Sequence, residues 1–242
     1  LRNSDIISDG KVKRAGVLFN EWYGYVCEGI YQTQEEVDNS ATLNNQITVG
    51  DLKYKDISGP DGVPDGKISA DYDRVPLGNS LPRFQYGGNI HAGYKGIDLS
   101  VAFQGIGKQN AYLTKEMVQP LRDNYGNIPS IVDGNYWSPF NTAEENAKAK
   151  YPRLSQVNRD SNYATSSFWL FNGAYFRLKN VTLGYTLPSV WTQKAGIKKV
   201  RLYVSASDLF CISNYPEGWD PEMGVSSYPI TTSLLFGLSV NF

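Results

Sequence analysis

The chain has 242 residues, and its 23 Lys and Arg side chains nearly balance its 24 Asp and Glu side chains. This balance excludes the basic face that nucleic acid requires, so we expect no nucleic-acid partner. A run of 18 apolar residues is absent, which excludes a transmembrane helix. It does not exclude a membrane β-barrel, whose strands are short and alternate in character.

The first predicted element is an acidic, glycine-rich loop. Its carboxylates are Asp56, Asp61, Asp65, Asp71 and Asp73. Ca²⁺ prefers several carboxylate and carbonyl oxygens on a chain that turns tightly, so these residues are candidate calcium ligands. The register departs from an EF-hand loop, however, because Val63 and Tyr72 stand where ligands belong. The alternative is a turn-rich loop whose carboxylates face water.

Five segments that alternate with period two are predicted to be strands. They are Phe84–Tyr94, Ile97–Gln104, Val181–Leu187, Val200–Ser207 and Thr232–Phe242. Lys95-Gly96 forms a two-residue turn between the first pair, and residues 188–199 connect the second pair. Much longer connections follow each pair, one at about 107–172 between the two pairs and one at about 210–231 before the last strand.

Alternation alone also suits a secreted β-sandwich, such as a glycan-binding module or adhesin. The regular exchange of long and short connections favours an outer-membrane barrel, with short turns on one side and long loops on the other. In a barrel the apolar positions face lipid and the polar positions face the lumen. The predicted lumen-facing side chains are Asn89, His91, Gln104, Arg201, Tyr203 and Ser205.

Catalytic motifs are missing from the sequence. G-x-S-x-G and Walker A patterns do not occur, and His91 is the single histidine, placed on the polar side of a strand. We therefore expect no enzyme activity and no catalytic residue. Cys27 and Cys211 form either one disulfide or two separate thiols. Aromatic side chains outside the strands, Trp22, Tyr112 and Trp169 among them, either stack on sugar rings or pack the loops together.

Seven stretches, taken in order, resemble the C-terminal part of the SusC/RagA family of TonB-dependent outer-membrane transporters. They are Glu21–Val37, Gly50–Gly78, Pro82–Gln104, Gly173–Pro188, Val200–Asn214, Gly218–Glu222 and Tyr228–Phe242. The resemblance implies the last five antiparallel strands of a 22-stranded transmembrane barrel, an all-β fold. The chain begins at Leu1 with neither Met nor a signal peptide, so it has either a mature, processed N-terminus or, as we expect, been cut from a longer protein.

The resemblance further implies a location in the outer membrane, in contact with its lipid, and import of oligosaccharides or peptides. A SusD-like surface lipoprotein would close the extracellular mouth of the barrel, and TonB would act through the N-terminal part of the parent protein. Residues 1–83 would form an extracellular region, and residues 84–242 would form barrel strands with extracellular loops at about 107–172 and 210–231.

Overall fold

The computed structural model describes residues 5–16, 18–122, 126–157, 159–223 and 227–242. The chain divides into two units. We call residues 1–81 and 110–171 the loop unit, and residues 82–109 and 172–242 the sheet unit. Residues 110–171, which the sequence analysis assigns to an extracellular loop, group with residues 1–81.

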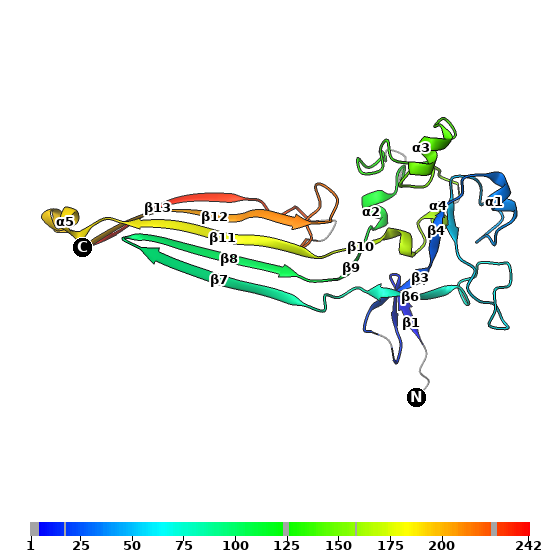
Figure 1. The fold of residues 1–242 in the computed structure, drawn as a ribbon, viewed down its shortest axis with the longest axis horizontal. Helices are drawn as coiled ribbons and strands as arrows, with labels where there is room; N and C mark the ends of the chain where they lie inside the picture. Colours follow the sequence, from blue (N-terminus) through cyan, green and yellow to red (C-terminus); the bar gives the residue numbers. More distant parts are fainter. Residues whose placement is uncertain (1–4, 17, 123–125, 158, 224–226) are drawn as a thin grey trace. The chain divides into compact units, whose positions relative to one another are not determined.

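The sheet unit consists of five antiparallel strands in the order β13-β12-β11-β8-β7 (Figure 1). Their bounds are Gln85–Tyr94 for β7, Ile97–Ile106 for β8, Tyr175–Thr186 for β11, Lys199–Ser213 for β12 and Ser233–Asn241 for β13. All five strands expected from the sequence are therefore confirmed. β11 and β12 extend beyond their expected ends, because period-two patterning is broken there by a bulge near Lys179.

A tight turn joins β7 to β8. Lys95 and Gly96 both adopt positive φ, at 47° and 86°. This is the backbone of a type I′ turn, whose twist matches that of the flanking strands. The turn lies at one end of the sheet, together with the connection 187–198 that carries α5 (Ser189–Thr192) and the 3₁₀ turn η2 (Gln193–Ala195). We call this the turn end, and the opposite end, near Tyr175 and Ser213, the loop end.

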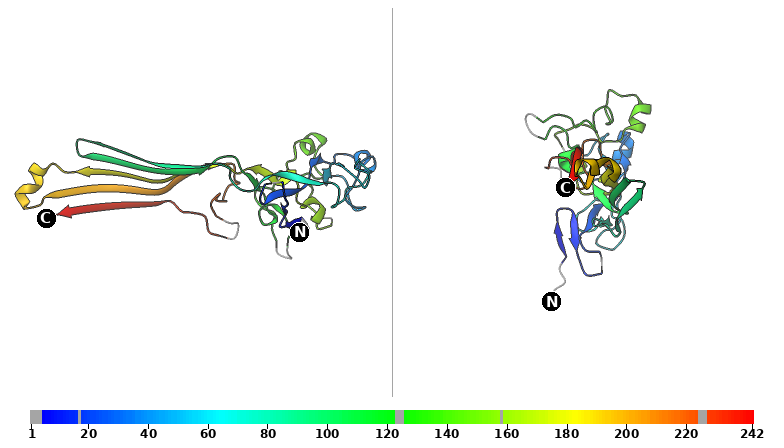
Figure 2. Two further views of the ribbon diagram at one scale, coloured as in Figure 1. Left: turned by 90° about the horizontal axis from the view of Figure 1, so that it is seen from below. Right: turned by 90° about the vertical axis from the view of Figure 1, so that its left-hand side faces the viewer.

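The long sheet is open and gently curved (Figure 2). Its edges are β7 and β13, and within the described residues neither edge pairs with another strand. Such an open sheet, with two bare edges, is the arrangement expected for a piece of a larger barrel.

The loop unit is built from short strands. β1 (Ile6–Ser8), β2 (Lys11–Lys13), β3 (Glu21–Tyr25) and β6 (Arg74–Asn79) form one sheet in that order. β4 (Cys27–Ile30) pairs with β5 (Leu52–Tyr54), and β9 (Asn110–Tyr112) pairs with β10 (Leu170–Asn172). Its helical turns are α1 (Gln34–Asp38), α2 (Lys115–Val118), α3 (Ala143–Lys148), α4 (Arg159–Asn162) and η1 (Ser167–Trp169). None of these short strands was predicted, because three to six residues carry too little alternation to detect.

The two units differ in how they bury apolar side chains. Every buried apolar side chain among the described residues belongs to the loop unit, with Trp169, Tyr31, Leu52, Val118 and Val132 at 1% exposure or less. In the sheet unit the large apolar side chains are partly or well exposed, Phe236 at 80% and Leu238 at 61%. The loop unit thus has a core of its own. The described part of the chain contains no helix long and apolar enough to cross a membrane.

A buried polar network ties the loop unit together at Asp51. The Asp51 carboxylate accepts hydrogen bonds from Arg153 Nε at 2.7 Å, Asn162 Nδ2 at 2.9 Å and the Thr48 backbone N–H at 3.0 Å. Asn162 in turn accepts the backbone N–H of Leu52 at 2.9 Å, and its carbonyl accepts the Trp169 indole N–H at 3.0 Å. The side chains of Asp51 and Asn162 are therefore both hydrogen-bonded, as a buried ionic network requires for stability.

Candidate functional site

The long sheet has two chemically different faces. Cross-strand pairing puts Leu99, Leu183, Val204 and Phe236 in one row and Ile97, Tyr185, Leu202 and Leu238 in the next. Both rows lie on one side, which we call the apolar face. The residues between them along each strand form the polar face.

All six residues expected to face a lumen share the polar face. Register places His91 opposite Ser100 and Asn89 opposite Ala102 on β7 and β8. Ser205 lies opposite Thr182, and Gln104 lies opposite Arg177. The structure thus confirms that these residues form one surface. That the surface lines a lumen stays a prediction.

Hydrogen bonds connect the middle of the polar face. Asn180 Nδ2 donates to Ser205 Oγ at 3.2 Å, and Thr182 Oγ1 donates to Asn180 Oδ1 at 2.9 Å. The hydroxyls of Thr182 and Ser205 lie 2.8 Å apart. These short, neutral side chains present hydroxyl and amide groups, which can exchange hydrogen bonds with water or a polar solute.

Near the turn end, Arg201 and Tyr203 lie flat against the polar face. Arg201 Nε donates to Asp98 at 2.9 Å, and its guanidinium stands 5.0 Å from the Tyr203 ring centroid. Two glycines on neighbouring strands make room for them. A Cβ at Gly184 would overlap the guanidinium of Arg201, and one at Gly237 would overlap the Tyr203 ring. Glycine in a strand often marks such a close approach.

At the loop end, a buried ionic cluster fastens a loop to the polar face. Arg177, 3% exposed at its side chain, lies 2.7 Å from both Asp220 and Glu222. Lys179 contacts Asp208 at 2.6 Å and Glu222 at 3.5 Å. We call Arg177, Lys179, Asp208, Asp220 and Glu222 the Arg177 cluster.

The cluster also contacts the backbone at Glu222 and Ile230. Asp220 also accepts the backbone N–H groups of Glu222 at 2.9 Å and Ile230 at 3.3 Å, and Gln104 Nε2 donates to Glu222 at 3.1 Å. Beside it, a pocket of about 420 Å³ is lined by Gln85, Tyr86, Gly87, Gln104, Gly105, Ile106 and Tyr175. The loop end of the polar face therefore offers a polar hollow next to buried charges.

Sequence reasoning assigned no role to the Arg177 cluster. Its signal was nonetheless present, since Arg177, Lys179 and Asp208 are charged residues within strands that otherwise alternate apolar and small polar side chains. A charge that a strand buries needs a partner of opposite sign, and Asp220 and Glu222 in the loop supply it.

The expected calcium ligands do not converge. Asp73 is buried, and its carboxylate accepts the backbone N–H groups of Ile57 at 2.8 Å, Ser58 at 3.1 Å and Ser69 at 2.7 Å. Asp56 accepts from Gly66 N–H at 2.7 Å and Asp65 from Lys67 N–H at 3.0 Å. Asp61 and Asp71 are exposed. Within the described ranges, no group of three or more carboxylate, His or Cys side chains is placed to hold a metal. Asp56, Asp65 and Asp73 thus bond to the backbone of their own loop.

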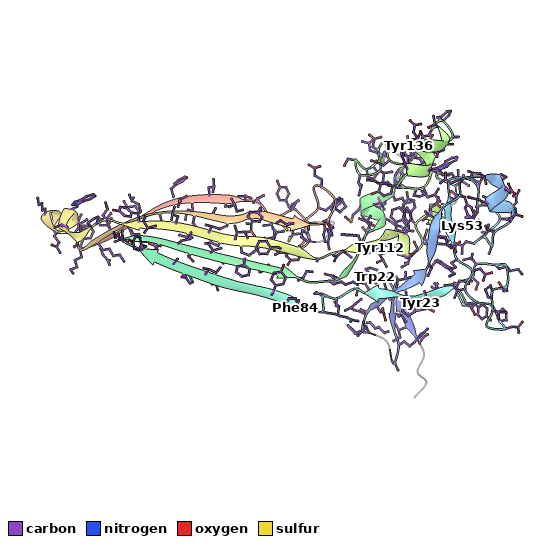
Figure 3. The ribbon with its side chains drawn as sticks, viewed as in Figure 1. Trp22, Tyr23, Lys53, Phe84, Tyr112 and Tyr136 are labelled. Carbon is purple, nitrogen blue, oxygen red and sulfur yellow. The ribbon has the colours of Figure 1, made fainter. Side chains whose placement is uncertain are left out.

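The loop-unit aromatics that could have stacked on sugars pack against one another. Trp22 stacks on Tyr112 with ring centroids 4.8 Å apart, and its indole N–H donates to the Asn110 carbonyl at 2.6 Å (Figure 3). Trp169 is buried among Tyr151, Tyr163 and Phe168. Packing is therefore the role that the structure gives to these rings.

The two cysteines are free thiols, so the disulfide alternative is not found. Burial raises the pKa of Cys27 to about 11, so this thiol stays protonated at neutral pH. Burial likewise raises the pKa of the nearby Tyr112 phenol to about 12. Neither group is activated for chemistry.

Comparison with known proteins defines the class. No family model matches the chain. TonB-dependent receptor P3 of Formosa agariphila is 30% identical over 250 residues, covering 96% of this chain and 23% of that protein. TonB-dependent receptor P26 of the same organism is 30% identical over 88% of this chain and 22% of its own length. The chain is therefore a homologue of the TonB-dependent receptors.

Within that class the similarity is to the SusC and RagA kind. TonB-dependent receptor SusC of Bacteroides thetaiotaomicron is 33% identical over 107 residues, 42% of this chain and 10% of that protein. A solved structure of the RagAB peptide transporter superposes with a TM-score of 0.69 at 21% identity, over 98% of this chain and 24% of the other. The RagAB peptide importer in its 'closed-closed' state superposes with a TM-score of 0.65 at 20% identity, over 98% of this chain and 25% of that chain. The chain thus has the fold of a barrel segment and spans less than a quarter of the length of the curated relatives it matches.

Proposed function

We propose that this chain forms part of the barrel wall and loops of a TonB-dependent importer in the outer membrane. The apolar face of the long sheet contacts lipid, and the polar face lines the lumen. The complete protein imports oligosaccharides or peptides. It carries no catalytic residues, in keeping with relatives that are named receptors.

The observation that carries this proposal is the sheet unit's lack of an apolar core. Its apolar side chains gather on one face and stay exposed there, Leu234, Phe236 and Leu238 each above 60%. In water, apolar surface of this extent is unfavourable at about 25 cal/mol per Å². In a bilayer the same surface meets hydrocarbon, and alternation of apolar-out with polar-in is typical of barrel strands.

The rival sandwich lacks the layer that it needs. A β-sandwich covers the apolar face of one sheet with a second sheet about 10 Å away. In the described part of the sheet unit, no second sheet packs on the apolar face. The arrangement of the described strands therefore does not support a sandwich-type binding module.

The partners follow from the same proposal. A SusD-like surface lipoprotein pairs with the complete protein, and TonB acts through parts of it outside this chain. The pairing with a lipoprotein is supported by the similarity to SusC and to RagAB, whose name denotes two components. The hydroxyl- and amide-rich polar face suits an uncharged sugar or a peptide backbone equally, so both substrate classes stand.

The test is made on the full-length protein in its own cell. We expect it to stay with outer membranes after a carbonate wash. We also expect deletion of its gene to abolish growth on either limiting oligosaccharides or limiting peptides, while growth on free sugars and amino acids continues. Release by carbonate, or unchanged growth on every polymer tested, would overturn the proposal.

A further inference from the structure

The apolar face is hollowed near its turn end. A groove of about 470 Å³ runs over β11, β12 and β13 and reaches the start of β8, and its apolar lining includes Ile97, Leu183, Tyr185, Leu202, Val204 and Phe236. The backbone of Gly184 and Gly237 also lines it. A groove of this kind on a lipid-contacting face has the shape and chemistry to hold a hydrocarbon chain.

The turn end next to the groove is strongly basic. Residues 93–98, 184–202 and 238–242 carry five basic side chains, Lys95, Lys194, Lys198, Lys199 and Arg201, and one acidic side chain, Asp98. Arg201 is bonded to Asp98 on the polar face, and Lys199 also interacts electrostatically with Asp98. Lys194 and Lys198 are exposed, and the Lys95 ammonium stands 5.2 Å from the Tyr94 ring centroid.

Lys95 and Lys198 are both close to the groove along the chain. Lys95 is two residues from Ile97, which lines it. Lys198 is four residues from Leu202, or about 13 Å at the rise of a strand. The backbone N–H of Thr186 donates to Gly96 at 2.7 Å and that of Leu187 to Val200 at 2.9 Å, which fixes both turns against the same sheet end.

Exposed amphipathic and apolar side chains surround these lysines. Tyr94 is 71% exposed, and Val190 and Trp191 of α5 are 69% and 66% exposed. Figure 1 shows α5 at the turn end, beside the C-terminal residue. Tyr and Trp prefer the boundary between headgroups and hydrocarbon, and Lys near that boundary reaches to phosphate.

We propose that the groove and the turn-end lysines together bind one anionic glycerophospholipid. An acyl chain lies in the groove, and Lys198, Lys194 and Lys95 surround the phosphate. Charge complementarity favours an anionic headgroup, because Lys95, Lys194 and Lys198, the turn-end side chains outside the Asp98 contacts, are all positive. The inference rests on the proposed membrane location of the sheet, since only a lipid-facing groove meets acyl chains.

The experiment measures binding of fluorescent phosphatidylglycerol to the full-length protein in mixed micelles, with fluorescent phosphatidylcholine as the comparison. We expect wild type to prefer phosphatidylglycerol and the preference to shrink as salt is added. Neutralising one Lys near a headgroup weakens binding about fivefold. Lys198→Gln is therefore expected to weaken phosphatidylglycerol binding about fivefold.

Two matched controls separate a site from a general effect. Lys199→Gln removes the same charge one residue away, on a side chain that interacts with Asp98, and is expected to change binding less than twofold. Val204→Trp fills the groove and is expected to weaken the binding of both lipids. Val181→Trp adds the same bulk on the apolar face outside the groove and is expected to leave the binding of both lipids unchanged.

The possible outcomes are distinct. Equal affinity for the two lipids, equal losses in Lys198→Gln and Lys199→Gln, or a preference for lipid A over phosphatidylglycerol would each overturn the inference and leave the membrane location standing. Failure of the protein to enter micelles at all would instead overturn the proposed function.

Discussion

At the scale of single residues, Arg177 has the most demanding environment in the sheet unit. Its guanidinium is nearly inaccessible to water and contacts carboxylates from a strand and from the 218–222 segment. Removing one partner from a buried ion pair leaves the others charged and unpaired, which costs much more than the pair itself contributes. The residue therefore matters both for stability and for where the loop lies.

We predict that Arg177→Ala lowers the free energy of unfolding of the full-length protein by about 3–5 kcal/mol. The measurement is a guanidinium titration in lipid vesicles. Arg201→Ala is the control, since Arg201 also pairs with one carboxylate on the polar face but remains accessible to solvent. A loss for Arg177→Ala no larger than that for Arg201→Ala would contradict the prediction.

Asp73 has a structural role where a metal-binding role was expected. One carboxylate bonds three backbone N–H groups drawn from both ends of the loop, at Ile57, Ser58 and Ser69. We predict that Asp73→Ala destabilises the loop unit by about 2–4 kcal/mol, because buried donors lose a charged acceptor.

Asp71→Ala provides the comparison for that change. Asp71 is exposed, so its removal should alter stability by no more than about 0.5 kcal/mol. Limited proteolysis of residues 55–75, followed by mass spectrometry, reads the loop directly. Equal cleavage rates in the two variants would show that Asp73 does not hold the loop.

At the scale of elements, β13 presents opposite chemistry at adjacent positions. Leu238 lies opposite Leu202 on the apolar face, and Ser239 lies opposite Arg201 on the polar face. A strand turns successive side chains to opposite sides of a sheet, so neighbouring residues meet different solvents when one face is lipid.

We predict that Leu238→Lys costs about 2–4 kcal/mol of stability in vesicles, whereas Ser239→Lys costs little. The reason is that a Lys at position 238 would enter hydrocarbon, while one at 239 would remain in water. A folding titration of both variants in the full-length protein measures the difference. Similar costs at the two positions would remove the basis for the lipid-facing assignment.

At the scale of the whole molecule, the two units place different demands on their surroundings. The loop unit has buried aromatic and aliphatic side chains and a closed polar network at Asp51. The sheet unit ends at bare edges on β7 and β13, whose backbone N–H and C=O groups cost several kcal/mol each if left unpaired in hydrocarbon.

We therefore predict that residues 1–242 produced alone do not form a stable transmembrane structure. Five strands are too few to close a barrel, since single-chain bacterial barrels have eight or more. Circular dichroism during urea unfolding in detergent should show no cooperative transition for the strands of residues 1–242 and a cooperative one for the full-length protein. A monodisperse, cooperatively unfolding barrel formed by residues 1–242 would refute this.

The sequence determined the five long strands, the Lys95-Gly96 turn and the residues that share each face, because period-two alternation over seven or more residues is a local property. It could not locate the short strands of the loop unit, because those strands depend on contacts between distant segments. Tertiary structure alone decided the roles of Arg177 and Asp73. Whether a carboxylate binds a cation, a guanidinium or its own backbone depends on which donors the fold brings within 3 Å, and spacing along the chain does not specify that distance.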